Sequence, residues 1–464
     1  MNYSTFIGAA VAAGSLVCAS VAVAAPEVGA YAYAVEKHLM PLIEAEVIPG
    51  AVVGVYRDGE ASFYPIGTLD YEGVDGEEMP TAETLYEIGS ISKVLTGVLF
   101  ADAIRRGEVT KDTLVDDLLP EGVDAMDFDG TEVALWHLTT HSSGWPTSPA
   151  NLRPTDPDRP YFGYTEEKLY EFISKVEPKR EPGTEFEYSN ISVGLLGTLI
   201  AKNAGVGYEE LVMERVIEPL GIEGFRIAMD DEERGRLAPA TSGGRATKPY
   251  ESLGVLDPAG MWIASAPELL EFAAANLTDG EGEIYESLQM ARKPMFKNDY
   301  GQVCFGWMLA RDGSSYWHNG KTGGYSSYMA SNPVLQTAVV VLTNGATLYT
   351  TGAGERIFQQ IVGMNPDPIQ IESAEPIDQE YAARLVGNYD SPFFKMFITL
   401  ERGRLFARIT NQSALMIEPT DEVNRYRYSG VDAELVFDVP EEGSATRVTL
   451  HQNGMEYPCG RVED

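Results

Sequence analysis

Hydrophobic and polar positions divide the chain into a mixed region and a later region that contains strands alone. Apolar side chains recur at helical spacing over 33–47, and two β-rich runs over 50–67 flank Asp58-Gly59, a dipeptide typical of a hairpin turn. Helical and loop stretches fill the middle, and strand character returns over 326–346 before a helical pattern over 354–363. Strands near both ends with helices between them predict an α+β domain.

The pattern changes after residues 366–380, a stretch rich in prolines and acidic residues that predicts a linker. Beyond this stretch, residues 395–410, 433–439 and 446–454 are short alternating runs with glycine turns. Such runs are typical of strands that each bury one face, so we expect a small all-β barrel or sandwich over 381–464.

Length and charge add to this division. The chain has 464 residues, which is too long for one ordinary domain, and we expect a larger domain over 25–365 before the linker. The formal net charge is -36 and the pI is near 4.4. Repulsion at long range then argues against nucleic acid or anionic lipid as a partner, and the acidic surface mainly favours solubility.

The first 24 residues have the composition of a secretory signal. They are apolar and rich in small residues, and they end in Ala22-Val23-Ala24 just before a proline at position 26. We therefore predict cleavage near Ala24 and a periplasmic or extracellular mature chain. The alternative is an uncleaved transmembrane anchor, although the small residues and the Ala-x-Ala ending favour removal.

Later windows are too short or too polar to span a bilayer, so membrane contact is expected only through an uncleaved signal. Cys18 would suit a lipoprotein, but Val17 before it fits that signal poorly. Removal of the signal leaves Cys304 and Cys459. An oxidising compartment permits a disulfide between them, but their spacing does not imply one, and the pairing stays open.

Residues 86–104 form a nearly all-apolar helical pattern with a lysine in its first turn. Lys93 follows Ser90 by three places, so the two side chains lie on one helix face. Burial and the positive helix N-terminus would both lower the pKa of this amine, and a neutral amine accepts a serine proton. In the alternative, Ser90 caps an ordinary helix and Lys93 extends to solvent, which is the commoner case for an isolated Ser-x-x-Lys.

Two further motifs follow in order: Tyr188-Ser189-Asn190, and His318-Asn319-Gly320 leading into Thr322-Gly323-Gly324. Together the three resemble the active-site motifs of the serine β-lactamase and penicillin-binding-protein superfamily. The second motif begins with a tyrosine, Tyr188, and in this it resembles one branch of the superfamily. That branch holds class C β-lactamases, D-aminopeptidases, D-alanyl-D-alanine carboxypeptidases and related esterases. Looser similarities cover most of residues 30–362.

This resemblance implies a β-lactamase-like fold, in which an antiparallel sheet is flanked by helices and joined to an all-helical region. The tail resembles the lipocalin-like module that some of these hydrolases carry. Residues 321–323 spell Lys-Thr-Gly, which is the third motif in many relatives. In those relatives the motif is followed by a second run that contains Thr-Gly-Gly, and Thr322-Gly323-Gly324 matches this later run. His318 therefore stands at the position of the family's lysine. A histidine of ordinary pKa is mostly neutral at pH 7, so it lacks the fixed cation that holds a β-lactam carboxylate.

The resemblance also assigns roles to single residues. Ser90 is expected to attack a carbonyl, while Lys93 and Tyr188 share the proton transfers. The backbone N–H groups of Ser90 and Lys321, beside Gly320, are expected to form the oxyanion hole. Asn190 is expected to bind the substrate amide, and His318 to support Tyr188 and a substrate carboxylate. This chemistry requires no metal and no organic cofactor.

Other candidate sites are weaker. His137 and His141 have the i, i+4 spacing of zinc ligands on a helix, but the glutamate of a metalloprotease motif is missing, and a structural role near the active-site wall is the better interpretation. Asn344 follows a strand and either reaches the substrate or ends the strand in a turn. The chain has no Gly-x-Ser-x-Gly elbow and no nucleotide-binding glycine loop.

The sequence therefore predicts an exported serine hydrolase that acts on amides, D-amino-acid peptides or esters. One alternative is a class C-like β-lactamase. An alternative of another class is a penicillin-binding sensor or sequestering protein that is acylated without turnover. Expected partners are small molecules or short peptides, including peptidoglycan fragments and β-lactams. The acyl donor, its stereochemistry and the oligomeric state stay open.

Overall fold

The computed structural model describes residues 29–70, 78–298, 301–371, 377–410, 412, 414–428, 432–452 and 454–462. The predicted signal segment, residues 1–24, lies outside these ranges. Within them, none of the helices has the length and apolar character needed to cross a bilayer. Cys304 and Cys459 are both buried and both free, so the disulfide that the sequence left open is not formed.

Eight described strands form one antiparallel sheet in the order β2-β1-β12-β11-β10-β9-β8-β7. The N-terminal hairpin predicted around Asp58-Gly59 is present, and both turn residues have positive φ. The hydrophobic β12 lies between β1 and β11 in the middle of the sheet and is buried along its whole length. The strands are β1 (Gly50–Arg57), β2 (Glu60–Gly67), β7 (Phe296–Asn298), β8 (Gly301–Val303), β9 (Met308–Leu309), β10 (Tyr316–Lys321), β11 (Ser326–Asn332) and β12 (Thr337–Thr343).

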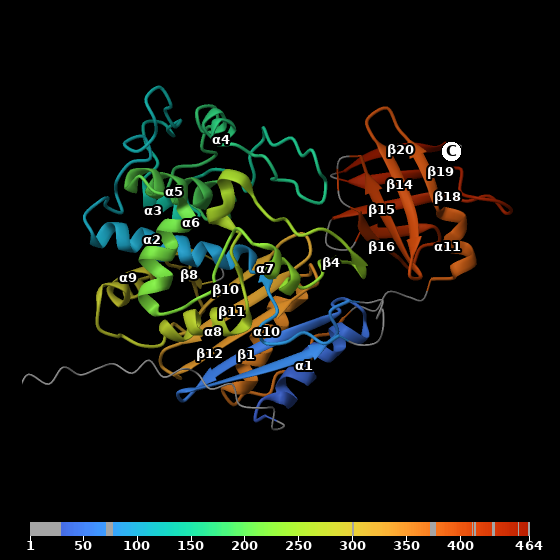
Figure 1. Ribbon diagram of the computed structural model, residues 1–464. Helices are drawn as coiled ribbons and strands as arrows, with labels where there is room; N and C mark the ends of the chain where they lie inside the picture. The colour runs from blue at the N-terminus through green and yellow to red at the C-terminus, as the bar shows by residue number, and fades with distance from the viewer. Residues whose placement is uncertain are drawn as a thin grey trace, which may run out of the picture.

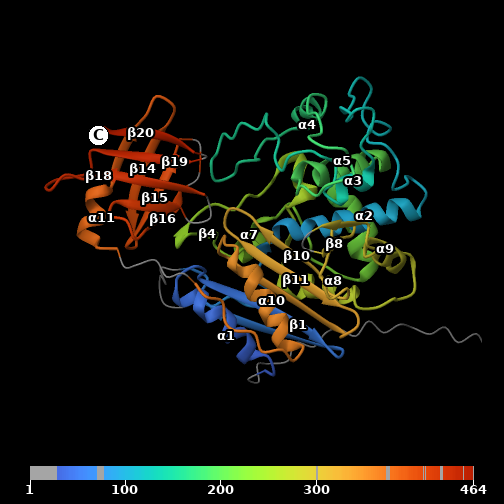
Figure 2. The ribbon, with the colours of Figure 1, turned by 180° about the vertical axis from the view of Figure 1, so that it is seen from behind.

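Helices cover both faces of this sheet (Figures 1 and 2). On one face α1 (Ala32–Glu44) and α10 (Tyr349–Ile361) pack side by side over a core that includes Val53, Val341 and Ile357. On the other face α8 (Ala266–Ala275) packs against β12 and β1. Both predicted helical patterns, over 33–47 and 354–363, correspond to helices.

A helical region adjoins the second face, with α2 (Ser92–Arg105) at its centre (Figure 1). Helix α2 packs against α5 (Asn190–Ala204) and α9 (Glu283–Ala291) and is buried nearly all round. The other short elements here are α3 (Leu135–Thr139), α4 (Glu166–Ile173), α6 (Tyr208–Val212), α7 (Asp231–Arg236), η2 (Met213–Ile217), η3 (Glu218–Leu220), η4 (Gly254–Ala259), β4 (Thr241–Ser242) and β5 (Arg245–Ala246).

The prediction of one helix over 86–104 is wrong at its start. Residues Tyr86–Glu87 form a short strand, β3, that pairs with β6 (Ile263–Ala264), and the 3-10 turn η1 (Gly89–Ile91) precedes α2. Gly89 has φ +55, a left-handed value that an α-helix does not accept. Apolar periodicity alone could not separate a buried strand and turn from the helix that follows.

The C-terminal part is a closed barrel of eight described antiparallel strands, as the all-β prediction expected. Its interior is filled by side chains that include Tyr389, Leu405 and Phe437, and α11 (Gln379–Leu385) packs beside it. The strands are β13 (Gly387–Asp390), β14 (Lys395–Glu401), β15 (Arg404–Ile409), β16 (Leu415–Pro419), β17 (Arg425–Tyr428), β18 (Ala433–Asp438), β19 (Arg447–Gln452) and β20 (Met455–Val462).

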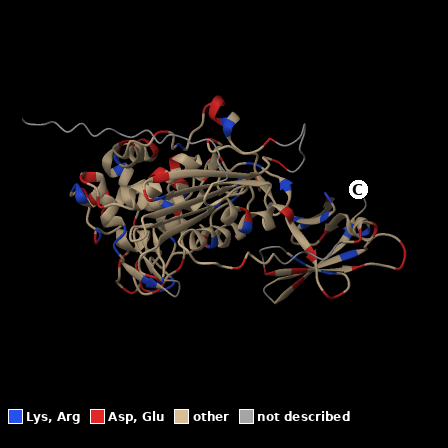
Figure 3. Ribbon diagram, turned by 90° about the horizontal axis from the view of Figure 1, so that it is seen from below, with Lys and Arg blue, Asp and Glu red and all other residues tan. Residues whose placement is uncertain are grey.

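The barrel is joined to the first domain by arginine contacts. Arg404 of β15 donates hydrogen bonds to the carbonyls of Ala45 and Glu46, which follow α1. Arg245 of the β4–β5 hairpin pairs with Glu401 at 3.1 Å and lies over the ring of Phe406. Figure 1 shows β4 reaching from the sheet toward β16, and acidic and basic residues lie on both domains (Figure 3).

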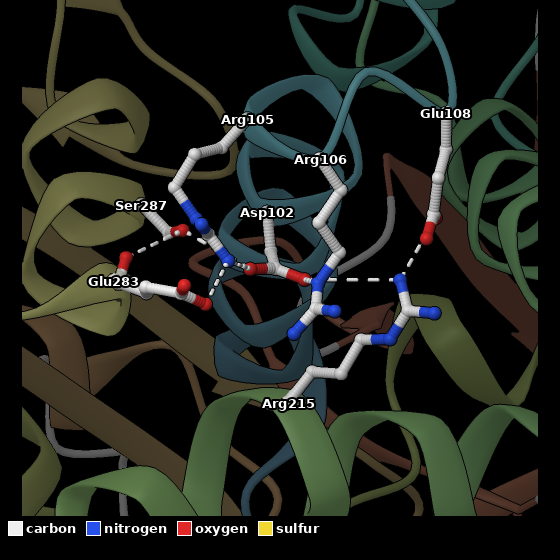
Figure 4. Close-up of polar contacts among 7 residues, drawn as sticks. All are labelled: Asp102, Arg105, Arg106, Glu108, Arg215, Glu283 and Ser287. Carbon is white, nitrogen blue, oxygen red and sulfur yellow. Dashed lines mark hydrogen bonds and ion pairs between the residues drawn. The ribbon is translucent and has the colours of Figure 1, made fainter.

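Asp102, near the end of α2, is a buried carboxylate surrounded by arginines (Figure 4). It lies 2.8 Å from Arg105 and 2.7 Å from Arg106, both on its own chain segment, and 3.7 Å from Arg215. Two of these arginines also contact a second acid, Glu283 or Glu108. The cluster joins α2 to the elements that carry Glu283 and Arg215, α9 and η2.

Candidate active site

Ser90 lies in the 3-10 turn η1, pressed against the end of β10. A Cβ atom on Gly89 would lie 2.5 Å from the backbone nitrogen of Lys321. A Cβ atom on Gly320 would lie 2.0 Å from the carbonyl oxygen of Ile88. Only glycine at both positions lets the two backbones approach this closely, so the first and third sequence motifs meet through glycine.

Lys93 is fully buried one turn into the same segment, and its amine has three neighbours. Nζ lies 2.9 Å from Ser90 Oγ, 2.8 Å from Asn190 Oδ1 and 2.5 Å from the carbonyl oxygen of Ala259. The amide and carbonyl oxygens accept hydrogen bonds only. They take two N–H groups of the amine, and the third direction faces the serine hydroxyl.

This arrangement suits a neutral amine. A neutral amine has two N–H donors and one lone pair, which matches two carbonyl-type acceptors and one hydroxyl donor. Burial lowers the pKa of Lys93 well below its ordinary value, and the three contacting groups carry no negative charge. The helix dipole disfavours a positive charge in the first turn, and a neutral Lys93 avoids this repulsion.

The segment that supplies the Ala259 carbonyl is fixed by buried polar contacts. The Asp257 carboxylate accepts from the backbone N–H of Leu253, and burial raises its pKa to about 6. Thr96, on α2, donates to the Pro258 carbonyl at 2.7 Å. Asp257 and Thr96 belong to none of the three motifs, so the sequence did not mark them as part of the site.

Tyr188 lies against both Ser90 and Lys93. Its ring centroid is 4.8 Å from Lys93 Nζ. Burial raises the pKa of the phenol far above 10, while a side-chain hydrogen bond with Ser90 lowers it in part. Tyr188 is therefore a neutral phenol at neutral pH. It can donate and accept a proton at Ser90, but it is not a phenolate before the reaction begins.

His141, which was predicted as structural, stacks on the Tyr188 ring at 4.4 Å between centroids. Its Nδ1 accepts from the backbone N–H of Ser189, and burial, with Lys93 and His318 nearby, lowers its pKa well below 6.5. His137 lies on α3, and its Nδ1 accepts from the backbone N–H of Ala134. His141 lies beyond the end of α3, so the two rings do not share a helix face as zinc ligands would.

His318 is buried on β10 with its Nδ1 2.6 Å from the Asn319 carbonyl. Burial lowers its pKa to about 3. The expectation of an ordinary histidine pKa is therefore wrong. The conclusion that His318 is neutral at pH 7 holds even more firmly with the lower pKa. This position carries no positive charge at neutral pH.

Asn344 lies at the end of β12 and donates to the carbonyls of Leu69 and Pro239. It is fully buried, in keeping with the strand-end alternative. Lys321 has its backbone against Gly89 and its side chain exposed. Three separate segments thus meet at Ser90: η1 with α2, the start of α5 and the end of β10.

Comparison with known proteins matches residues 35–362 to the family described as Beta-lactamase. The chain belongs to the beta-lactamase family. A beta-lactamase of Escherichia coli (strain K12) is 28% identical over 347 residues, which cover 67% of this chain and 88% of that protein. Penicillin-binding protein 4 of Amycolatopsis lactamdurans is 25% identical over 369 residues, covering 74% and 93%.

Solved structures of the beta-lactamase family share the fold of the first domain. A class C beta-lactamase from Rhodobacter sphaeroides superposes with a TM-score of 0.61 at 24% identity, covering 71% of this chain and 99% of that one. A beta-lactamase/D-alanine carboxypeptidase from Pseudomonas syringae gives the same TM-score and coverage at 21% identity. Members of the beta-lactamase family are serine hydrolases that typically use a Ser-x-x-Lys motif.

Proposed function

We propose that the protein is an exported serine hydrolase in which Ser90 forms an acyl-enzyme with an ester, an amide or a D-amino-acid peptide. The observation that carries this proposal is the environment of Lys93. A buried amine with two carbonyl-type acceptors and one hydroxyl neighbour is arranged as a base for that hydroxyl. A snorkelling cap would instead carry its amine to water.

The reaction begins when the Ser90 hydroxyl loses its proton to Lys93 and Oγ attacks the carbonyl carbon. The resulting oxyanion is held by the backbone N–H groups of Ser90 and Lys321. The proton then passes through Tyr188 to the leaving group as its bond to the carbonyl carbon breaks. A water molecule attacks the acyl-enzyme in the second half, giving up its proton so that Ser90 Oγ leaves as a hydroxyl.

Asn190 is proposed to act on both partners of the reaction. Its Oδ1 accepts from Lys93 at 2.8 Å, which fixes the amine, while its NH₂ group is suited to the substrate carbonyl. His318 and Gly320, both on β10, form the wall of the proposed substrate site that lies across from Asn190. Because His318 is neutral, the wall lacks the cation expected for efficient β-lactam binding, and this favours esters and peptides.

A class C-like β-lactamase is the second candidate, favoured by the names of the relatives and of the solved structures. A sensor or sequestering protein that is acylated without turnover is the third, and penicillin-binding protein 4 is the relative that favours it. A periplasmic or extracellular location is proposed from the signal-like residues 1–24.

The test is intact-protein mass spectrometry of the wild type and Ser90→Ala after exposure to a penicillin, a D-alanyl-D-alanine peptide and a short-chain activated ester. Product release is followed in parallel. We expect a covalent adduct or repeated turnover that Ser90→Ala abolishes. Ser174→Ala, at a half-buried serine that follows α4, serves as the matched control and should behave as wild type.

Each outcome separates the candidates. Turnover of the ester or peptide supports the proposed hydrolase, and rapid turnover of the penicillin supports the β-lactamase. A stable penicillin adduct without product supports the sensor. Adducts that persist in Ser90→Ala would contradict Ser90 as the nucleophile.

A further inference from the structure

A cavity of about 480 Å³ lies between the first domain and the barrel, beside the end of the catalytic strand β10. Lys321, Thr322 and Gly323 form one side of it, and Arg408 of β15, with Ala414 and Leu415, forms the opposite side. The β4–β5 hairpin and Tyr250 complete the wall. A second cavity of about 340 Å³ is also lined by Lys321 and Leu415.

The charges that line the larger cavity are mostly balanced. Asp156 pairs with Lys248 and Arg159, while Arg245 pairs with Glu401. Two basic side chains are left, because the described residues offer neither Lys321 nor Arg408 an acidic partner within ion-pair distance. Burial lowers the pKa of Lys321, and a bound carboxylate would raise it again. Asp158 contributes one carboxylate to the lining. The cavity therefore keeps a positive excess in a chain whose net charge is -36.

Arg408 is already held in place. Its guanidinium lies 4.2 Å from the ring centroid of Phe397, its cross-strand partner on β14. A stacked guanidinium has lost most of its rotamer freedom, so binding a carboxylate costs little additional entropy, and the planar fork suits two parallel hydrogen bonds.

The wall that carries Arg408 is also fixed relative to the catalytic strand. Arg404, four residues earlier on the same strand, binds the Ala45 and Glu46 carbonyls of the first domain. Thr241 of the β4–β5 hairpin donates from its backbone N–H to the Gly324 carbonyl, just after the third motif. Barrel, hairpin and catalytic strand thus form one connected set of contacts.

We propose that Arg408 and Lys321 form a carboxylate-binding subsite across the domain junction, which makes the barrel a determinant of substrate specificity. The subsite selects acyl donors that bear a carboxylate away from the reacting carbonyl. This proposal rests on the proposed hydrolase function, and it assigns the Lys321 side chain a role separate from that of its backbone N–H group.

The test compares three phenyl esters. One is neutral, one has an acyl chain that ends in a carboxylate, and one carries a carboxylate on the leaving group. For each, kcat/KM is measured at low and at high salt. We expect the wild type to prefer one of the two anionic esters over the neutral one. In Arg408→Gln the ratio of anionic to neutral kcat/KM should fall about tenfold, and high salt should reduce the same ratio in the wild type.

Two further variants make the comparison sharp. Arg408→Lys keeps the charge and should restore part of the preference. Arg447→Gln removes an arginine on β19 that lies outside the cavity lining, and it should leave the ratio unchanged. An unchanged ratio in Arg408→Gln would overturn the subsite while leaving the hydrolase intact.

Failure of the hydrolase proposal gives a different result. In that case Ser90→Ala hydrolyses every ester as well as the wild type does. The subsite is then tested by binding alone, with glutarate titrated into Ser90→Ala and into Ser90→Ala/Arg408→Gln by calorimetry. Weaker binding in the double variant, by about tenfold, supports the subsite, and equal binding overturns it.

Discussion

The two ends of α2 each bury a group that can carry charge, and the protein treats them in opposite ways. At the N-terminal end, Lys93 contacts a hydroxyl, an amide oxygen and a backbone carbonyl, all uncharged. At the C-terminal end, Asp102 lies within 4 Å of Arg105, Arg106 and Arg215 (Figure 4). Both side chains are almost inaccessible to water.

The difference follows from what each group is required to do. A buried carboxylate that joins helices needs cations beside it to offset the loss of water, and Asp102 has three. In the proposed mechanism Lys93 must be neutral before it can accept a proton, and an amine is neutral at pH 7 only when little around it stabilises its charged form. Among the residues that the structure describes, no carboxylate contacts Lys93, and this is as informative as the arginines at Asp102.

The largest effect is expected when the amine itself is replaced. Lys93→Met should lower kcat/KM for a neutral ester by about a thousandfold or more, because Ser90 loses the neutral amine that is proposed to take its proton, and the phenol of Tyr188 is a much weaker base. Lys93→Arg should fail equally, since a guanidinium does not become neutral near pH 7. Steady-state kinetics on both variants provide the test, and activity in Lys93→Arg would show that only a cation is needed.

Replacing the other buried charge should act on stability. Asp102→Asn leaves the arginine cluster without its central carboxylate and should lower the free energy of unfolding by about 3–5 kcal/mol. Denaturant titration measures this, while kcat on folded protein should stay near that of the wild type. Glu171→Gln removes an exposed helical ion pair with Lys175 and is the matched control, with an unchanged midpoint. An equal midpoint in both variants would contradict the structural role of the cluster.

Giving Lys93 a counter-charge should make it resemble Asp102. In Asn190→Asp, a carboxylate replaces the amide whose oxygen lies 2.8 Å from Nζ, and its negative charge should raise the pKa of Lys93. Activity at pH 7 should fall by roughly 10–100-fold and recover as pH rises, because the amine must lose its proton to act. Asn190→Ala loses the same amide without adding charge. Identical pH profiles in the two variants would argue against this account.

The smallest expected effect is a dependence of the free energy of unfolding on pH. Burial lowers the pKa of Lys93 in the folded protein, whereas the unfolded chain keeps a value near 10.4. Between pH 7 and 9, unfolding then takes up one proton at Lys93, so stability rises with pH. The free energy of unfolding of the wild type minus that of Lys93→Met should increase by about 1.4 kcal/mol per pH unit. A flat difference would mean that folded Lys93 is charged.

Much of the fold could be predicted because it is encoded locally. The Asp58-Gly59 hairpin, the two helices over one face of the sheet and the alternating strands of the barrel all carry their own periodicity. The start of the segment at 86–104 could not be predicted in this way. Tyr86–Glu87 form a strand because they pair with Ile263–Ala264, a partner about 180 residues away.

The candidate site shows the same division. Two of the three short motifs predicted Ser90, Lys93, Tyr188 and Asn190, and the structure brings these side chains into contact. The Ala259 carbonyl was missed as a member of the site, since a backbone oxygen has no sequence signature. His141 was expected to have a structural role near the site, but its stacking on Tyr188 depends on the path of the chain and could not be predicted. Histidine pKa values depend on burial, so the sequence alone suggested an ordinary value for His318.

The glycine contacts between Gly89 and β10 have a consequence for how the protein matures. The nucleophile Ser90 and its base Lys93 lie in one segment, but the other proposed oxyanion donor, Lys321, lies more than 200 residues later. The two segments meet only when the sheet and the helical region have docked. A chain that has formed its helices but not this junction has a Ser90 without a working environment. Covalent labelling of Ser90 by an activated ester should therefore occur only in fully folded molecules. The labelled fraction, followed during refolding, would measure the rate of the last folding step.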